Sequence, residues 1–144
     1  MPTYAITTAR DVSPEQRARI AQSVTAIHAG EADAPRSFVQ VIFYRVEPGS
    51  IFIAGVPASP DHVWVRADIR AGRSAEQKAA ILTRIMGETS AILGISEQDA
   101  WVYVSDIPAQ GVLEFGNVLP QPGGEAEWLA GLPEELRETL SRAD

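Results

Sequence analysis

Two kinds of hydrophobic pattern alternate along this chain. Short apolar runs with the period of a β-strand are separated by longer segments in which apolar residues recur at helical spacing. The pattern predicts four strands, over residues 3–8, 38–44, 62–69 and 100–104. It also predicts one helix that ends at Gly30 and another that ends at Gly94, because glycine commonly terminates a helix. Each pair of strands therefore brackets one helix.

The two helices begin with the same signal. Ser13-Pro14-Glu15-Gln16 predicts a capping box with proline at the first helical position, and Ser74-Ala75-Glu76-Gln77 repeats it in the second half. Two β-α-β units in tandem follow, each a parallel strand pair joined by a right-handed crossover. One helix per unit covers only one face of the four-stranded sheet, so the other face must be buried against other subunits. We expect an α+β fold that forms an oligomer.

The length and the pattern together predict a single domain over 1–144. Its parts are repeat 1 over about 2–46, repeat 2 over about 62–105, and a C-terminal arm and helix over about 106–144. In the arm we expect a short strand or turn near Glu114, a linker over 120–124 and a helix opened by Pro133.

Composition excludes several classes of function. The net charge of −7 argues against binding nucleic acid or an anionic membrane surface. The absence of cysteine excludes thiol nucleophiles, disulfides and thiolate metal sites. Two distant histidines without a tight carboxylate cluster predict no metal site. No secretion signal and no apolar run near 18 residues is found, so we expect a cytoplasmic protein.

The N-terminus carries the first candidate for chemistry. Processing normally removes an initiator methionine before a small residue, and here that would leave the secondary amine of Pro2 at the start of the first strand. An α-amino group titrates near about 8. Burial and neighbouring cations lower that pKa, whereas a carboxylate raises it, so the amine can serve as acid, base or nucleophile near neutral pH. Alternatively, Met1-Pro2 is only a start followed by a residue that avoids helix.

Arg70 and Arg73 bracket Gly72 just before the second helix. Cations are unfavourable at a helix N-terminus, where two guanidinium groups and free N–H groups make a good pocket for an anion. The first repeat has Ala9 and Val12 at the corresponding positions, so the fold alone does not require the arginines. The alternative is a pair of solvated loop side chains.

Three further residues have two interpretations each. Glu114 is the only charged residue between Asp106 and Glu125, and is either a turn tip facing water or a partly buried base with a raised pKa. Tyr103 shares a strand face with Trp101 and is either a core aromatic or a functional hydroxyl. His28 ends the apolar stripe of the first helix, where it is either a structural histidine or part of a site.

Together these residues resemble those of the tautomerase superfamily, and most of all the cis-3-chloroacrylic acid dehalogenase family. The resemblance covers essentially the whole chain, although the loop over 31–37 and Ile69 depart from the family. The stretches that carry it are Thr25-Ala26-Ile27-His28, Arg70-Ala71-Gly72-Arg73-Ser74, Trp101-Val102-Tyr103, Pro108-Ala109-Gln110, Glu114-Phe115-Gly116, Leu119-Pro120-Gln121-Pro122-Gly123 and Glu127-Trp128.

The resemblance implies a homotrimer without metal or organic cofactor that acts on a small unsaturated carboxylic acid. In this family a cationic Pro2 would protonate the carbon beside the carboxylate, which Arg70 and Arg73 would hold with help from His28. Glu114 and Tyr103 would activate water for attack at the halogen-bearing carbon. The halohydrin would collapse to malonate semialdehyde and halide. One site per subunit is expected, because Val63 takes the place of Pro2 in the second repeat.

Two alternatives stay open. The same site would serve an enol–keto tautomerase of phenylpyruvate type, which needs Pro2 as a neutral base, or a hydratase or decarboxylase. A trimeric binding protein without catalysis is the other, as one branch of the superfamily suggests.

Overall fold

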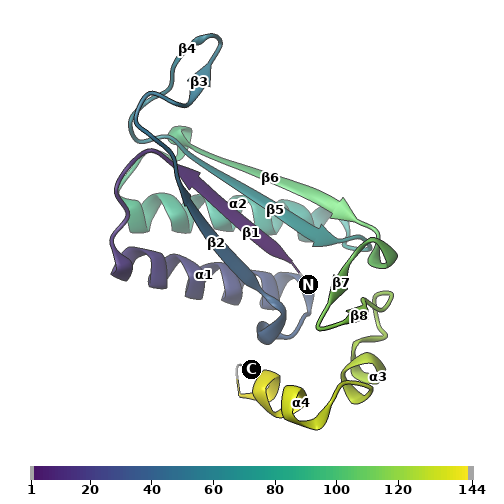
Figure 1. The fold of residues 1–144 in the computed structure, drawn as a ribbon. Coiled ribbons are helices and arrows are strands. Elements are labelled where there is room, and N and C mark those ends of the chain that lie inside the picture. The colour runs from purple at the N-terminus through teal and green to yellow at the C-terminus, as the bar shows by residue number, and fades with distance from the viewer. Residues whose placement is uncertain (1, 143–144) are drawn as a thin grey trace.

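The computed structural model describes residues 2–142. Its centre is a four-stranded sheet in the order β2-β1-β5-β6 (Figure 1). The strands are β1 (Thr3–Thr8), β2 (Gln40–Arg45), β5 (Val63–Arg70) and β6 (Ala100–Ile107). β1 pairs with β2 in parallel, and β5 with β6 likewise. The central strands β1 and β5 are antiparallel, with Thr3 opposite Asp68 and Thr8 opposite Val63. The tandem β-α-β prediction is confirmed.

Helices α1 (Pro14–Ala32) and α2 (Ala75–Leu93) lie side by side on one face of the sheet (Figure 1). Both predicted capping boxes are present: the hydroxyls of Ser13 and Ser74 accept the N–H of the residue three positions on, whose glutamine side chain accepts the cap N–H. Each box satisfies two amides that a helix N-terminus leaves without a partner.

Two predicted boundaries in the first half are wrong. α1 does not end at Gly30 but continues to Ala32, which is buried, and stops at Asp33 in the left-handed conformation (φ 48°). The second strand does not begin at Phe38. That residue ends a short 3₁₀ helix (Arg36–Phe38), and β2 starts at Gln40. Ala32 and Phe38 are both buried. Their packing against the rest of the fold shifts the two boundaries, since tertiary packing overrides local propensity.

The core lies between the sheet and the two helices. Alternate residues of β5, from Val63 to Ile69, are almost completely buried, and so are Tyr4 and Ile6 of β1. They pack against Ile20, Val24 and Ile27 of α1 and Ile81 and Ile85 of α2. The opposite face of the sheet has no covering layer in the described chain and exposes large side chains such as Tyr44, Trp101 and Tyr103. We call it the open face.

The remaining elements lie beyond the two ends of the sheet (Figure 1). At one end projects a hairpin of β3 (Phe52–Ile53) and β4 (Val56–Pro57). At the other end follow the hairpin of β7 (Leu113–Glu114) and β8 (Asn117–Val118), then α3 (Glu125–Ala130) and α4 (Glu134–Ser141). Two more 3₁₀ helices are Glu97–Asp99 and Ala109–Gly111. None of the helices in 2–142 is long and apolar enough to cross a membrane.

Candidate active site

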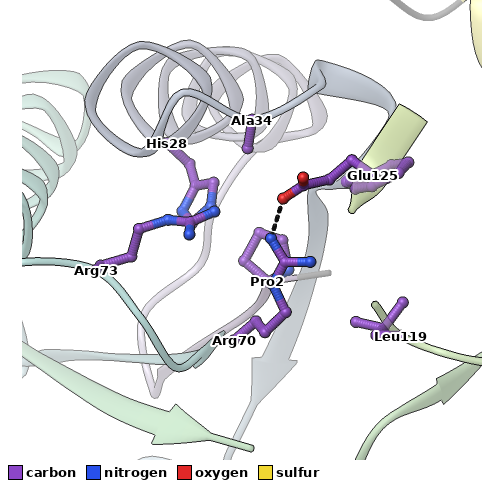
Figure 2. A pocket seen from close by; sticks show the side chains of 8 residues that line it. Pro2, His28, Ala34, Arg70, Arg73, Leu119 and Glu125 are labelled. Atoms are coloured by element: carbon purple, nitrogen blue, oxygen red, sulfur yellow. Dashed lines mark hydrogen bonds and ion pairs between the residues drawn. The ribbon is translucent and has the colours of Figure 1, made fainter. Parts of the chain in front are cut away.

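A small cavity lies at the end of the sheet where β1 begins and β5 ends. Because these strands are antiparallel, Pro2 at the head of β1 lies beside Arg70, the last residue of β5. The carbonyl of Pro2 accepts the N–H of Gln40 at 3.0 Å, so the neighbouring strand β2 fixes the peptide between Pro2 and Thr3. The cavity measures about 20 Å³. Its lining residues, drawn as sticks in Figure 2, are Pro2, His28, Ala34, Phe38, Arg70, Arg73, Leu119 and Glu125.

The cavity brings together four of the residues that the sequence singled out. Pro2 is buried, His28 comes from α1, Arg70 from β5, and Arg73 from the loop before α2 (Figure 2). The prediction that the methionine before Pro2 is removed concerns Met1, which lies outside the described residues. The chain therefore places Pro2, which would become the terminal residue after removal of the methionine, against two guanidinium groups.

Arg70 and Arg73 differ in their surroundings. The Arg70 side chain is only 8% exposed; it donates from Nη1 to the carbonyl of Pro120 at 2.8 Å and from Nη2 to the carboxylate of Glu125. The Nε of Arg73 is buried without a hydrogen-bond partner among the described residues. Burial and the charge of Arg70 lower the pKa of Arg73, although a guanidinium keeps its proton at any ordinary pH. A buried donor without a partner is what a bound anion would satisfy.

His28 is part of the cavity wall and also of the core. It is 2% exposed, and its Nδ1 lies 2.7 Å from the hydroxyl of Tyr4, whose ring meets the imidazole edge-on. Burial, and after it the charge of Arg73, lowers the pKa of His28 from 6.5 to about 4. Burial also raises the pKa of Tyr4. At neutral pH, His28 is therefore an uncharged imidazole that is oriented by a protonated phenol.

Glu114 and Tyr103 do not line this cavity. Glu114 lies in β7 and lines a neighbouring cavity together with Phe38, which borders both; burial raises the pKa of Glu114. Tyr103 is on the open face, 50% exposed, with its ring edge-on to Trp64. It is therefore not a core aromatic within its own chain.

Sequence reasoning missed Glu125, which closes the cavity. It lies 55 residues from Arg70 in the chain, at the start of a six-residue helix that the hydrophobic pattern does not show. The one signal that could have suggested it is a buried cation that needs a counter-charge. No group of three or more potential metal ligands is found within residues 2–142.

The comparisons with known proteins identify the family. Residues 1–131 match the Tautomerase_3 family model, described as "Putative oxalocrotonate tautomerase enzyme". The chain thus belongs to the tautomerase superfamily, whose members are enzymes. No curated protein sequence matches it.

Solved structures identify the branch. The crystal structure of N1, a member of the cis-3-chloroacrylic acid dehalogenase family, is 42% identical, with a TM-score of 0.93 over 97% of this chain and 99% of that one. This chain is a member of the same family.

More distant structures share the fold alone. FG41 malonate semialdehyde decarboxylase inhibited by 3-bromopropiolate is 21% identical, with a TM-score of 0.69 over 91% of this chain and 99% of that chain. A fused 4-OT asymmetric trimer is 22% identical, with a TM-score of 0.74 over 81% of this chain and 94% of that chain.

Proposed function

We propose that this protein is a cofactor-independent enzyme that uses the amine of Pro2 to add water to small 3-substituted unsaturated carboxylic acids. The proposed reaction is the hydrolytic dehalogenation of a 3-haloacrylate to malonate semialdehyde. The observation that carries the proposal is the convergence of Pro2, Arg70 and Arg73 on one cavity. A carboxylate bound by two guanidinium groups withdraws electrons from the double bond, which makes the carbon that carries the halogen electrophilic.

The proton and bond changes balance as follows. Glu114 takes a proton from water as the water oxygen bonds to C3, and the ammonium form of Pro2 gives a proton to C2. The resulting halohydrin loses halide from C3 and a proton from its hydroxyl, which leaves the aldehyde. The raised pKa of Glu114 suits a base that works near neutral pH. Neutral His28, with Nδ1 accepting from Tyr4, keeps its Nε2 proton to donate to the carboxylate.

Tyr103 requires a second subunit in this proposal. It lies on the open face, which we expect neighbouring chains of a homotrimer to cover, and related structures are described as trimers. From there its hydroxyl would serve the site of an adjacent chain and not its own cavity. Covering the open face would also bury Trp101 and Tyr44, which is favourable by about 25 cal/mol per Å² of apolar surface.

The charge balance of the cavity keeps an enol–keto tautomerase as the second candidate. Arg70 and Arg73 lower the pKa of a nearby amine, which favours a neutral Pro2 that acts as base. The carboxylate of Glu125 has the opposite effect and favours the cationic acid. Titration of the ¹⁵N-labelled Pro2 amine by NMR separates the two: a pKa above neutral supports the dehalogenase, and one well below it the tautomerase.

The direct test is incubation with cis- and trans-3-chloroacrylate and with an enol acid, followed by NMR of the products. We expect malonate semialdehyde and chloride from wild type. We expect losses of about 10²–10⁴-fold in kcat/KM for Pro2→Ala and Glu114→Gln, as is typical when a catalytic acid or base is removed. Glu127→Gln, which removes one negative charge at an exposed position, is the matched control for Glu114→Gln. Intact mass of each protein establishes that Met1 is absent. Full activity of Pro2→Ala would overturn the mechanism.

A further inference from the structure

Arg70 ends β5 and Arg73 lies in the loop that follows, and a later part of the chain covers this segment. We call residues 70–73 the arginine loop and residues 119–125 the C-terminal strap. The carbonyl of Pro120 accepts from Arg70 Nη1 at 2.8 Å. A Cβ atom built on Gly72, whose φ is +114°, would come within 2.6 Å of the Pro122 side chain. The strap therefore lies directly on the arginine loop, and any larger residue at its middle would separate the two.

Glu125 ends the strap and is itself held in place. One carboxylate oxygen accepts the backbone N–H of Gly123 at 2.8 Å, and the other pairs with Nη2 of Arg70 (Figure 2). Partial burial raises the pKa of Glu125, but its hydrogen bonds and the charge of Arg70 outweigh burial and hold that pKa below its usual range. Its own turn thus fixes Glu125, which makes it a stationary counter-charge for Arg70.

A counter-charge is needed here because the arginines repel each other. The charge of Arg70 lowers the pKa of Arg73, whereas the charge of Glu125 raises it. A guanidinium without a fixed partner would turn away from a second cation, and the cavity would lose its paired donors. The carbonyl of Pro120 orients the Arg70 side chain but carries no charge that would balance it.

We propose that Glu125 is a positioning residue that holds Arg70 beside Arg73 so that both guanidinium groups can bind the carboxylate of the substrate. The inference rests on the proposed function, in which that carboxylate is the recognised group. The alternative role of Glu125 predicts the opposite effect on carboxylate binding. If Glu125 merely occupied the place of the substrate carboxylate on Arg70, its removal would strengthen carboxylate binding.

The test measures the Kd of propionate, a saturated acid that the enzyme cannot hydrate, by calorimetry on the assembled protein. We expect Glu125→Ala to weaken binding about ten-fold, the size of one lost charge-assisted hydrogen bond. Glu125→Gln keeps the shape and one acceptor but removes the counter-charge, so we expect binding to stay weaker than in wild type by about three-fold or more. Glu127→Ala, on the exposed side of the same helix, should bind like wild type.

A second readout does not need a ligand. In ¹H–¹⁵N spectra the Nε–H signal of Arg70, assigned by its loss in Arg70→Lys, should be sharp in wild type and Glu127→Ala. It should broaden in Glu125→Ala while backbone signals outside the strap stay in place, which a general loss of structure would not produce. Propionate binding that is equal or tighter in either Glu125 variant, or an unchanged Arg70 signal, overturns the positioning role. If wild type itself does not bind propionate, the proposed carboxylate site is wrong, and the Arg70 signal alone then decides the role of Glu125.

Discussion

Acidification should destabilise this protein through His28. The side chain is 2% exposed and its pKa is lowered from 6.5 to about 4, by burial first and by the charge of Arg73 second. Between these two values the unfolded chain binds a proton at this position and the folded chain does not. The free energy of unfolding therefore falls as the pH falls through this window, and is unaffected by His28 above it.

The magnitude follows from the shift. One pKa unit corresponds to about 1.4 kcal/mol, so the loss across the whole window is roughly 3 kcal/mol, of which about 2 kcal/mol is reached near pH 5. That is a large part of the total of about 5–15 kcal/mol that is usual for a folded domain. The assay is urea unfolding at about pH 7 and about pH 5, at one protein concentration because self-association adds to apparent stability. His28→Gln, which takes up no proton, is the comparison.

We expect the stability of wild type relative to His28→Gln to fall by about 2 kcal/mol between the two pH values. Other titrating groups, such as Glu114 with its raised pKa, are present in both proteins and cancel in the difference. Equal pH dependence of wild type and the variant would refute the reasoning, because it would mean that folding leaves the pKa of His28 where it is in the unfolded chain.

Three further predictions concern the support of the site and the assembly. Tyr4→Phe should lower the free energy of unfolding by about 1–2 kcal/mol, measured in urea, because it leaves the buried Nδ1 of His28 without its partner. Gly72→Ala should cost about 1–3 kcal/mol in the same assay, since φ is +114° and the new Cβ would press on the strap. Thr7→Arg, in the middle of the open face, should reduce the mass seen by analytical ultracentrifugation to that of one 15.5 kDa chain.

Matched substitutions make these predictions specific. Gly30→Ala, within α1 and with no atom near the new Cβ, should add about 0.5–1 kcal/mol. Ala79→Arg, on an exposed position of α2, should leave the assembly unchanged. A destabilisation by Gly30→Ala as large as that by Gly72→Ala, an unaltered stability of Tyr4→Phe, or an intact oligomer of Thr7→Arg would contradict the respective argument.

The regular part of the fold could be predicted from the sequence because its signals are local. The capping serines Ser13 and Ser74 and the alternation over 63–69 each act within a few residues, and each is found in the structure. The errors arise where a distant contact decides. α1 runs past Gly30 to a buried Ala32, whose burial depends on elements that no local pattern includes.

The candidate site divides in the same way. Pro2, Arg70 and Arg73 stand out because they break local rules, and the antiparallel central strands bring them together. Glu125 gives no such signal, since an acidic residue in the first turn of a helix is ordinary. Only the three-dimensional arrangement shows that its carboxylate faces a guanidinium. Tyr103 is ambiguous for another reason: it lies on the open face, so a role for its hydroxyl would require a second chain to cover that face.

The antiparallel pairing of β1 with β5 has a consequence for engineering. Duplication of one unit creates two equivalent corners, and the corner opposite Pro2 has Val63 at the head of β5 and Ala9 where the other has Arg70. Continuity of the backbone denies that corner an amine. A circular permutant opened before Val63 would give Val63 the terminal amine and place Pro2 inside the chain. With arginine at position 9, this permutant would test whether the second corner can be converted into a working reaction centre.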